Sequence, residues 1–190
     1  METLVEHYLG NPLLLAVILF GATFVLEEAA ILMAAGLAAA GEMSPALALA
    51  SVAAGMVVSD WCLYALGALA IRHRGIAAWV SEERLEQGRQ LLHRSTFAAG
   101  LLARLVPWLL FPIFTASGFL RVGFRRFALI NLGIALVYVM AVFYGAFGLY
   151  EILLARMGHW AWLVGAVLLL AILWAGRRIT RRYLSGGADN

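Results

Sequence analysis

The sequence predicts an all-α integral membrane protein, built from two oppositely oriented re-entrant helical hairpins and three spanning helices in an inverted repeat. The composition predicts the membrane class, because 64% of the 190 residues are hydrophobic and the mean hydropathy is +0.89, whereas apolar residues make up about half of a soluble domain. Two apolar stretches are interrupted near their middles, which predicts the hairpins. The basic residues gather in three short clusters, which predicts the topology.

The first apolar stretch, residues 8–41, is too long for one membrane span. As a continuous helix it would measure about 50 Å, whereas the hydrocarbon core of a bilayer is about 30 Å thick. Glu27 and Glu28 divide it into two short arms, so we expect a hairpin that enters and leaves on the same side. The next stretch, residues 46–71, is long enough to span and carries Asp60 near its middle.

Residues 97–120 form the second predicted hairpin. Arg104, Pro107 and Pro112 interrupt this stretch and leave apolar arms that each cover about half of the bilayer. Proline lacks a backbone donor and tends to break a helix. We therefore expect a turn between Pro107 and Pro112.

Two uncharged stretches, residues 127–150 and 157–176, predict plain spanning helices. Residues 1–182 thus form a single membrane domain. The remaining segments are predicted to be a cytoplasmic interfacial linker (72–96), an outer loop (151–156) and a disordered tail (183–190).

The arginines fix the sides of the membrane. All but Arg104 and Arg156 of the 14 arginines lie within residues 72–94, 121–126 and 177–182. Positive residues favour the cytoplasmic side, and these three clusters share one side only if the second hairpin enters and returns. The C-terminus is then cytoplasmic and the N-terminus lies outside.

A faint internal repeat supports two related halves. Gly36 and Gly41 of the first hairpin match Gly118 and Gly123 of the second in spacing. Short interrupted segments at matching positions of two halves indicate a transporter-type site at the membrane midplane.

Four charges stand within the apolar stretches: Glu27, Glu28, Asp60 and Arg104. Facing lipid, they would cost on the order of 10 kcal/mol together, so we expect them to converge at mid-depth. Three carboxylates against one arginine leave excess negative charge, which disfavours ionisation of all three. At least one carboxylate should therefore exchange a proton, which predicts coupling to a proton gradient.

The second hairpin predicts a binding site for an anion. Arg104 approaches its tip, where Pro107 and Pro112 lie, and guanidinium groups bind phosphate or carboxylate. Broken helices add unpaired N–H groups that attract anions. The predicted ligand is the head group of an amphiphile.

Each of these residues also has a structural interpretation. Arg104 could extend to the interface or only neutralise Asp60. One of Glu27 and Glu28 could cap the second arm of its hairpin. Asp60 could serve as a hydrogen-bond partner between helices, and these alternatives stay open.

Several motifs together resemble one membrane-protein family. They are Glu27-Glu28 before Ala34-Ala35-Gly36; the block Gly55, Asp60, Tyr64, Gly67; and Arg104-x-x-Pro107 with Pro112, Ser117-Gly118, Phe127 and Gly133. This set resembles the DedA family, also called the SNARE-associated Golgi or VTT domain, over about residues 10 to 150.

The resemblance implies two facing re-entrant hairpins and transport of lipid-linked cargo, with some members implicated in recycling undecaprenyl phosphate and others in phospholipid scrambling or proton-dependent homeostasis. It carries site roles to Glu27, Glu28, Asp60 and Arg104. This chain departs from the family at Leu110, where an arginine is common, and at Ser59, where a glycine is common. The loss of that arginine removes half of the expected cationic clamp for phosphate.

The favoured function is a proton-coupled transporter or flippase of an amphiphilic substrate, such as undecaprenyl phosphate or a phospholipid, in the inner or plasma membrane. The alternative is a non-transporting scaffold or envelope-homeostasis factor whose buried charges only hold helices together. We expect no enzymatic activity, because no histidine lies at mid-depth and no metal-ligand spacing occurs. No metal, cofactor or nucleic-acid partner is expected; the partners are lipids and protons, and a homo-oligomer is compatible with the sequence.

Overall fold

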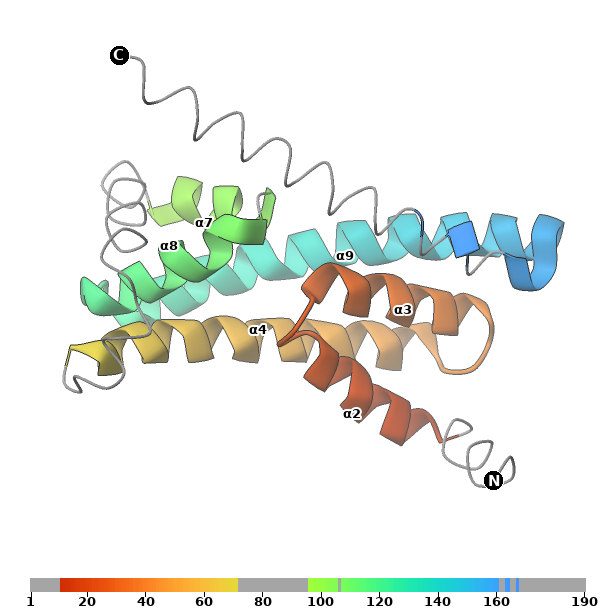
Figure 1. Cartoon of the computed structure of the whole chain (residues 1–190), viewed down its shortest axis with the longest axis horizontal. Coiled ribbons are helices and arrows are strands. Elements are labelled where there is room, and N and C mark those ends of the chain that lie inside the picture. The colour runs from red at the N-terminus through yellow and green to blue at the C-terminus, as the bar shows by residue number, and fades with distance from the viewer. Residues whose placement is uncertain (1–10, 72–95, 106, 161–162, 165–166, 168–190) are drawn as a thin grey trace, which may run out of the picture. The chain divides into compact units, whose positions relative to one another are not determined.

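A computed structural model describes residues 11–71, 96–105, 107–160, 163, 164 and 167, and within them all regular structure is helical. This confirms the all-α class for the described part of the chain (Figure 1). The helices are α2 (Pro12–Ala22), α3 (Glu27–Ala39), α4 (Pro45–Ala70), α7 (Thr96–Leu105), α8 (Pro107–Phe119) and α9 (Phe124–Met157), followed by the 3-10 turn η1 (Gly158–Trp160).

The chain divides into two compact units. Among the described residues, unit 1 comprises 11–56 with those from 136 onward, and unit 2 comprises those between 57 and 135. Each unit contains one pair of short helices, α2 with α3 or α7 with α8, whose members pack against each other. The order of short pairs and long helices agrees with the predicted repeat. The side from which each pair enters the membrane stays a prediction.

Helices α4 and α9 are long and apolar enough to cross a membrane. Helix α4 has 26 residues, about 39 Å of helix, and it coincides with the predicted span 46–71 to within one residue. Helix α9 differs from the prediction, because it continues through the predicted loop 151–156 to Met157. Residues 151–156, EILLAR, contain neither glycine nor proline, and charge alone does not end a helix; Gly158, at φ +57°, follows its last residue.

The surface and interior are those of a membrane protein. Large apolar side chains are exposed on the short and long helices alike, with 67% exposure at Leu13 of α2 and 71% at Leu129 of α9. Polar and charged side chains are buried instead, among them Asp60, Arg104 and Asn131. This distribution is unusual for a soluble monomer and agrees with contact between the outer surface and lipid.

In unit 1 the predicted interruption of the first apolar stretch is present. Asn11 caps α2, because its Oδ1 accepts hydrogen bonds from the backbone of Leu13 at 3.0 Å and Leu14 at 3.4 Å. The helix ends at Ala22, and α3 begins at Glu27. A Cβ added to Gly55 of α4 would lie 2.6 Å from the Phe20 carbonyl oxygen, so α2 and α4 approach closely.

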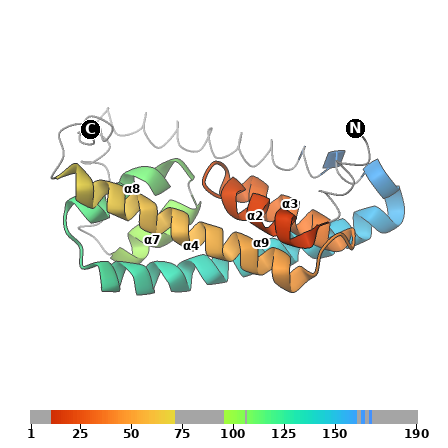
Figure 2. The same ribbon diagram turned by 90° about the horizontal axis from the view of Figure 1, so that it is seen from below.

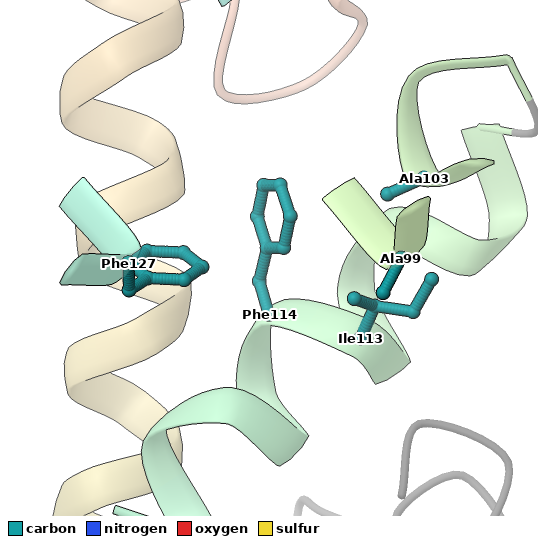
Figure 3. Packing of buried hydrophobic residues seen from close by; sticks show 5 residues of the cluster. All are labelled: Ala99, Ala103, Ile113, Phe114 and Phe127. Carbon is teal, nitrogen blue, oxygen red and sulfur yellow. The ribbon is translucent and has the colours of Figure 1, made fainter. Parts of the chain in front are cut away.

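In unit 2 the core is an apolar cluster contributed by α7, α8 and α9. Phe114 lies between Phe127 on one side and the small side chains of α7 on the other (Figure 3). The Phe114 and Phe127 rings meet edge to face with centroids 5.2 Å apart, a favoured aromatic geometry. The cluster is Ala99, Ala103, Ile113, Phe114 and Phe127.

Helices α4 and α8 lie side by side in direct backbone contact (Figure 2). A Cβ at Gly67 would overlap the Thr115 carbonyl, and a Cβ at Gly118 would overlap the Tyr64 carbonyl. Small residues at such crossings allow membrane helices to pack closely. Tyr64 adds a hydrogen bond from its hydroxyl to the Val122 carbonyl.

The prolines of the second hairpin act differently from each other. Helix α7 ends at Leu105 and α8 begins at Pro107, a position at which proline is favoured. Pro112 lies inside α8 and does not end it, so the predicted turn does not extend to Pro112. Thr115 Oγ1 bonds the Phe111 carbonyl at 2.5 Å in the same turn.

Two helices end in the same hydrogen-bonded motif. After α3, the backbone N–H of Glu42 donates to the Leu37 carbonyl at 3.0 Å, and Gly41 has φ +79°. After α8, the backbone N–H of Val122 donates to the Ser117 carbonyl at 3.0 Å, and Arg121 has φ +53°. These are Schellman caps with a left-handed residue at C′. The structural counterpart of Gly41 is therefore Arg121, two residues before the Gly123 that spacing predicts.

Three predicted segments are not tested by this fold. The tail 183–190 and residues 72–95 of the linker lie outside the described residues, as does most of the third span, 157–176. The cytoplasmic position of the C-terminus likewise stays a prediction.

The contact between α4 and α8 can be tested by substitution. Gly118→Ala is expected to lower the free energy of unfolding by about 1–3 kcal/mol, because the new Cβ would overlap the Tyr64 carbonyl. Gly133→Ala is the matched control, since nothing lies within 4 Å of a Cβ there, and should be neutral or stabilising. Thermal unfolding in detergent compares the two variants. Equal melting temperatures would contradict the close approach.

Candidate functional site

Three buried polar side chains meet inside unit 2. Asp60 comes from α4, Arg104 from the last turn of α7 and Asn131 from α9, and they are 0%, 3% and 2% exposed. Arg104 Nη2 forms a salt bridge with Asp60 Oδ2, and Asn131 Nδ2 donates to the same oxygen at 2.7 Å. The predicted meeting of Asp60 and Arg104 is thus present.

The helices place Arg104 favourably for a cation. It lies in the last turn of α7, where the helix dipole favours positive charge. Its guanidinium carbon is 5.7 Å from the centroid of the Phe114 ring, within the range of a cation–π contact. The arginine is therefore held by a carboxylate, a helix end and an aromatic face.

The donors at this site are unevenly distributed over the acceptors. Both Arg104 and Asn131 donate to Oδ2 of Asp60, whereas Oδ1 of Asp60 and Oδ1 of Asn131 are buried and accept no hydrogen bond from the described residues. A buried acceptor left unsatisfied costs about 1–3 kcal/mol. Oδ1 of Asp60 can consequently take a proton, and Oδ1 of Asn131 can accept a hydrogen bond from a further donor.

A small cavity adjoins Asn131. Ser117, Gly100 and apolar side chains of α8 and α9 complete its lining. The space open to the centre of a water molecule is about 10 Å³, which suits at most one water. This cavity therefore accommodates at most a water molecule and is too small for a lipid head group.

Glu27 and Glu28 lie in unit 1, in the first turn of α3. Glu27 is 9% exposed and Glu28 is half-buried. Carboxylates in a first helical turn interact favourably with the helix dipole, which agrees with the structural interpretation of this pair. Convergence of this pair with Asp60 and Arg104 stays a prediction.

The two prolines assigned to the site are on α8. Pro107 is its first residue, and Pro112 is buried within it. Leu110, which replaces an arginine common in the resembled family, packs against the core cluster of unit 2. At the position where the resembled family commonly has an arginine, this chain therefore has a leucine in contact with the apolar cluster that includes Phe114.

Asn131 is a site residue that the search for charges missed. It is the only amide side chain in the predicted span 127–150. Side-chain amides within membrane helices commonly form hydrogen bonds between helices. A search for neutral polar residues in the spans would have found it.

Comparison with protein families identifies the chain. The family model of the VTT domain, the DedA/SNARE-associated family domain, matches residues 13–147. The chain belongs to the VTT-domain family. The match extends over both helix pairs of this VTT-domain protein and includes Asp60, Arg104 and Asn131.

No significant match was found among curated proteins or among solved structures. Family membership and the two long apolar helices indicate a membrane location and a transporter-like role for this VTT-domain protein.

Substitution of Asn131 tests the geometry of the cluster. Asn131→Leu removes the 2.7 Å hydrogen bond to Asp60 and should lower the free energy of unfolding by about 1–3 kcal/mol. Asn131→Asp should lower it further, because two carboxylates would then share one guanidinium. The double exchange Asp60→Asn with Asn131→Asp should recover part of that loss. Chemical unfolding in detergent measures all three; an unchanged stability of Asn131→Leu would contradict the arrangement.

Proposed function

We propose that this VTT-domain protein is a proton-coupled transporter or flippase of an amphiphilic anion, with a lipid phosphate such as undecaprenyl phosphate or a phospholipid as its substrate. The observation that carries the proposal is the buried pair of Asp60 and Arg104, joined by Asn131. Asp60 and Asn131 lie on helices long enough to span a membrane. Ionisable residues at such positions usually mark ion or substrate pathways in membrane proteins.

Competition for Arg104 is the proposed basis of coupling. A guanidinium binds phosphate as well as it binds carboxylate, so an anionic head group and ionised Asp60 compete for the same donor. When Asp60 takes a proton, its attraction to Arg104 falls and the anion can replace it. One proton and one negative charge would then occupy the site together, which keeps the buried charge balanced.

Asn131 suits both states of this exchange. Its Nδ2 donates to ionised Asp60, and an amide oxygen can accept a hydrogen bond from a protonated carboxyl group. The proton would reach Asp60 at Oδ1, since Oδ2 already accepts two donors. Because the cavity beside Asn131 has room for at most one water, a head group would enter this cavity only if it widened.

Glu27 and Glu28 are proposed as further proton-handling groups, and Pro107 and Pro112 as residues that shape the substrate-binding hairpin. The support for the acids is their position at the start of α3, directly after the break in an apolar stretch. The proposed location is the inner or plasma membrane with a cytoplasmic C-terminus, and the proposed partners are lipids and protons.

A structural role for the buried pair is the second candidate. Asp60, Arg104 and Asn131 connect three helices of one unit, and Arg104 also contacts the Phe114 ring. A cluster that only holds α4, α7 and α9 together would have these same contacts. In that case the protein would act as a scaffold or envelope-homeostasis factor.

A neutral pair separates the two candidates. Asp60→Asn alone should destabilise the protein by about 3–5 kcal/mol, because it leaves a buried cation, and Asp60→Asn with Arg104→Gln should restore most of that stability. If the pair carries transport, proton-driven uptake of a fluorescent lipid phosphate into proteoliposomes should fall at least about 100-fold in the folded double variant. Glu42→Gln, which removes an exposed carboxylate, is the control. Full uptake by the double variant would assign the pair a structural role, and absence of uptake by the unmodified protein would support the scaffold.

The topology that transport requires can be measured separately. With Cys62 replaced by serine, single cysteines at positions 5, 85 and 185 should react with an impermeant reagent from outside, inside and inside, respectively. The expectation follows from the arginine clusters. Labelling of positions 5 and 85 from the same side would refute the two oppositely inserted hairpins.

A further inference from the structure

A second hollow in unit 2 lies apart from the buried cluster. Its volume is about 300 Å³. The end of α4 supplies one wall through Tyr64, Ala68 and Leu69, with Ile71 directly after the helix, and the end of α8 supplies Gly118 and Arg121. The side chains of Leu69, Ile71 and Arg121 are exposed.

Arg121 occupies a position that favours glycine. It has φ +53° in the Schellman cap of α8, where the matching cap of α3 has Gly41. Residues with a Cβ are strained in this conformation, whereas glycine is not. The backbone turn therefore gains nothing from an arginine here. The side chain can still complement the carboxyl end of α8 electrostatically, which is its structural alternative.

The charge and the polarity of the hollow are complementary to those of an anionic amphiphile. Among the described residues that line it, Arg121 is the only charged one, and Arg125 and Arg126 are exposed on the first turn of α9. The Tyr64 hydroxyl already donates to the Val122 carbonyl. One cationic group thus stands beside a wall of exposed leucine and isoleucine.

We propose that this hollow binds an anionic phospholipid, with Arg121 on the phosphate and the acyl chain along Leu69 and Ile71. A lipid fits better than free phosphate because the wall is apolar and belongs to a helix of membrane-spanning length. The inference goes beyond the proposed transport, since it concerns binding from one leaflet and requires neither Asp60 nor translocation.

The test compares lipid retention by matched arginine variants. Native mass spectrometry of the whole protein, purified in detergent with equal phosphatidylglycerol and phosphatidylcholine, gives the ratio of the two bound lipids. Arg121→Gln should reduce the preference for phosphatidylglycerol by roughly fivefold or more. Arg126→Gln removes the same charge from the neighbouring turn but not from the lining, and should leave the ratio nearly unchanged. Equal losses in both variants would overturn the site in favour of diffuse attraction.

Two further variants and a competition with phosphate distinguish lipid binding at this site from a loss of folding and from binding of free anions. Arg121→Gly should raise the melting temperature while it removes the lipid preference, and a preference retained in this variant would overturn the proposal. Ala68→Phe, which fills the hollow but keeps the arginine, should also remove the preference while the melting temperature is maintained. Millimolar inorganic phosphate should not displace the lipid; displacement would identify a free-anion site instead. Because binding is measured without transport, the result is independent of the activity of Asp60.

Discussion

The pairing of Asp60 with Arg104 is the constraint on which unit 2 depends. Either charge alone, removed from water, would cost several kcal/mol, and the hydrocarbon outside supplies no compensating donor. The two residues come from α4 and α7, and their second donor, Asn131, comes from α9, so these helices cannot separate without exposing an unpaired charge. The apolar cluster beside the pair, with Phe114 and Phe127 at its centre, borders a cavity that has room for at most one water.

Much of this arrangement could be predicted from the sequence, because a charged residue in an apolar stretch needs a partner and is easily recognised there. Asp60 and Arg104 were expected to meet, and the break before Glu27 follows from the length that a bilayer permits. The loop expected at residues 151–156 is helical, since charged residues at a membrane boundary do not break a helix. Asn131 was missed because it is neutral, and Pro112 was misplaced because proline can remain inside a helix when its surroundings compensate.

The replacement of a family arginine by Leu110 also becomes interpretable. Leu110 packs against the core cluster, and the salt bridge of this site joins Arg104 to Asp60. Such a balanced pair suits the proposed exchange of one anion against one proton, and it equally suits a structural lock. The two functions differ in whether a competing anion can reach Arg104, not in the resting contact itself.

The division between the two compact units runs through helices rather than through loops. Helix α4 passes from one unit to the other at Met56 and Val57, and α9 does so at Ala135 and Leu136. An unbroken α-helix resists bending, and sharp kinks need a proline, a glycine or an inserted group. Gly55 and Gly133 stand within two residues of these crossing points. Because glycine lowers helix propensity, Gly55 and Gly133 are the positions near these crossing points where a bend in α4 or α9 would cost least.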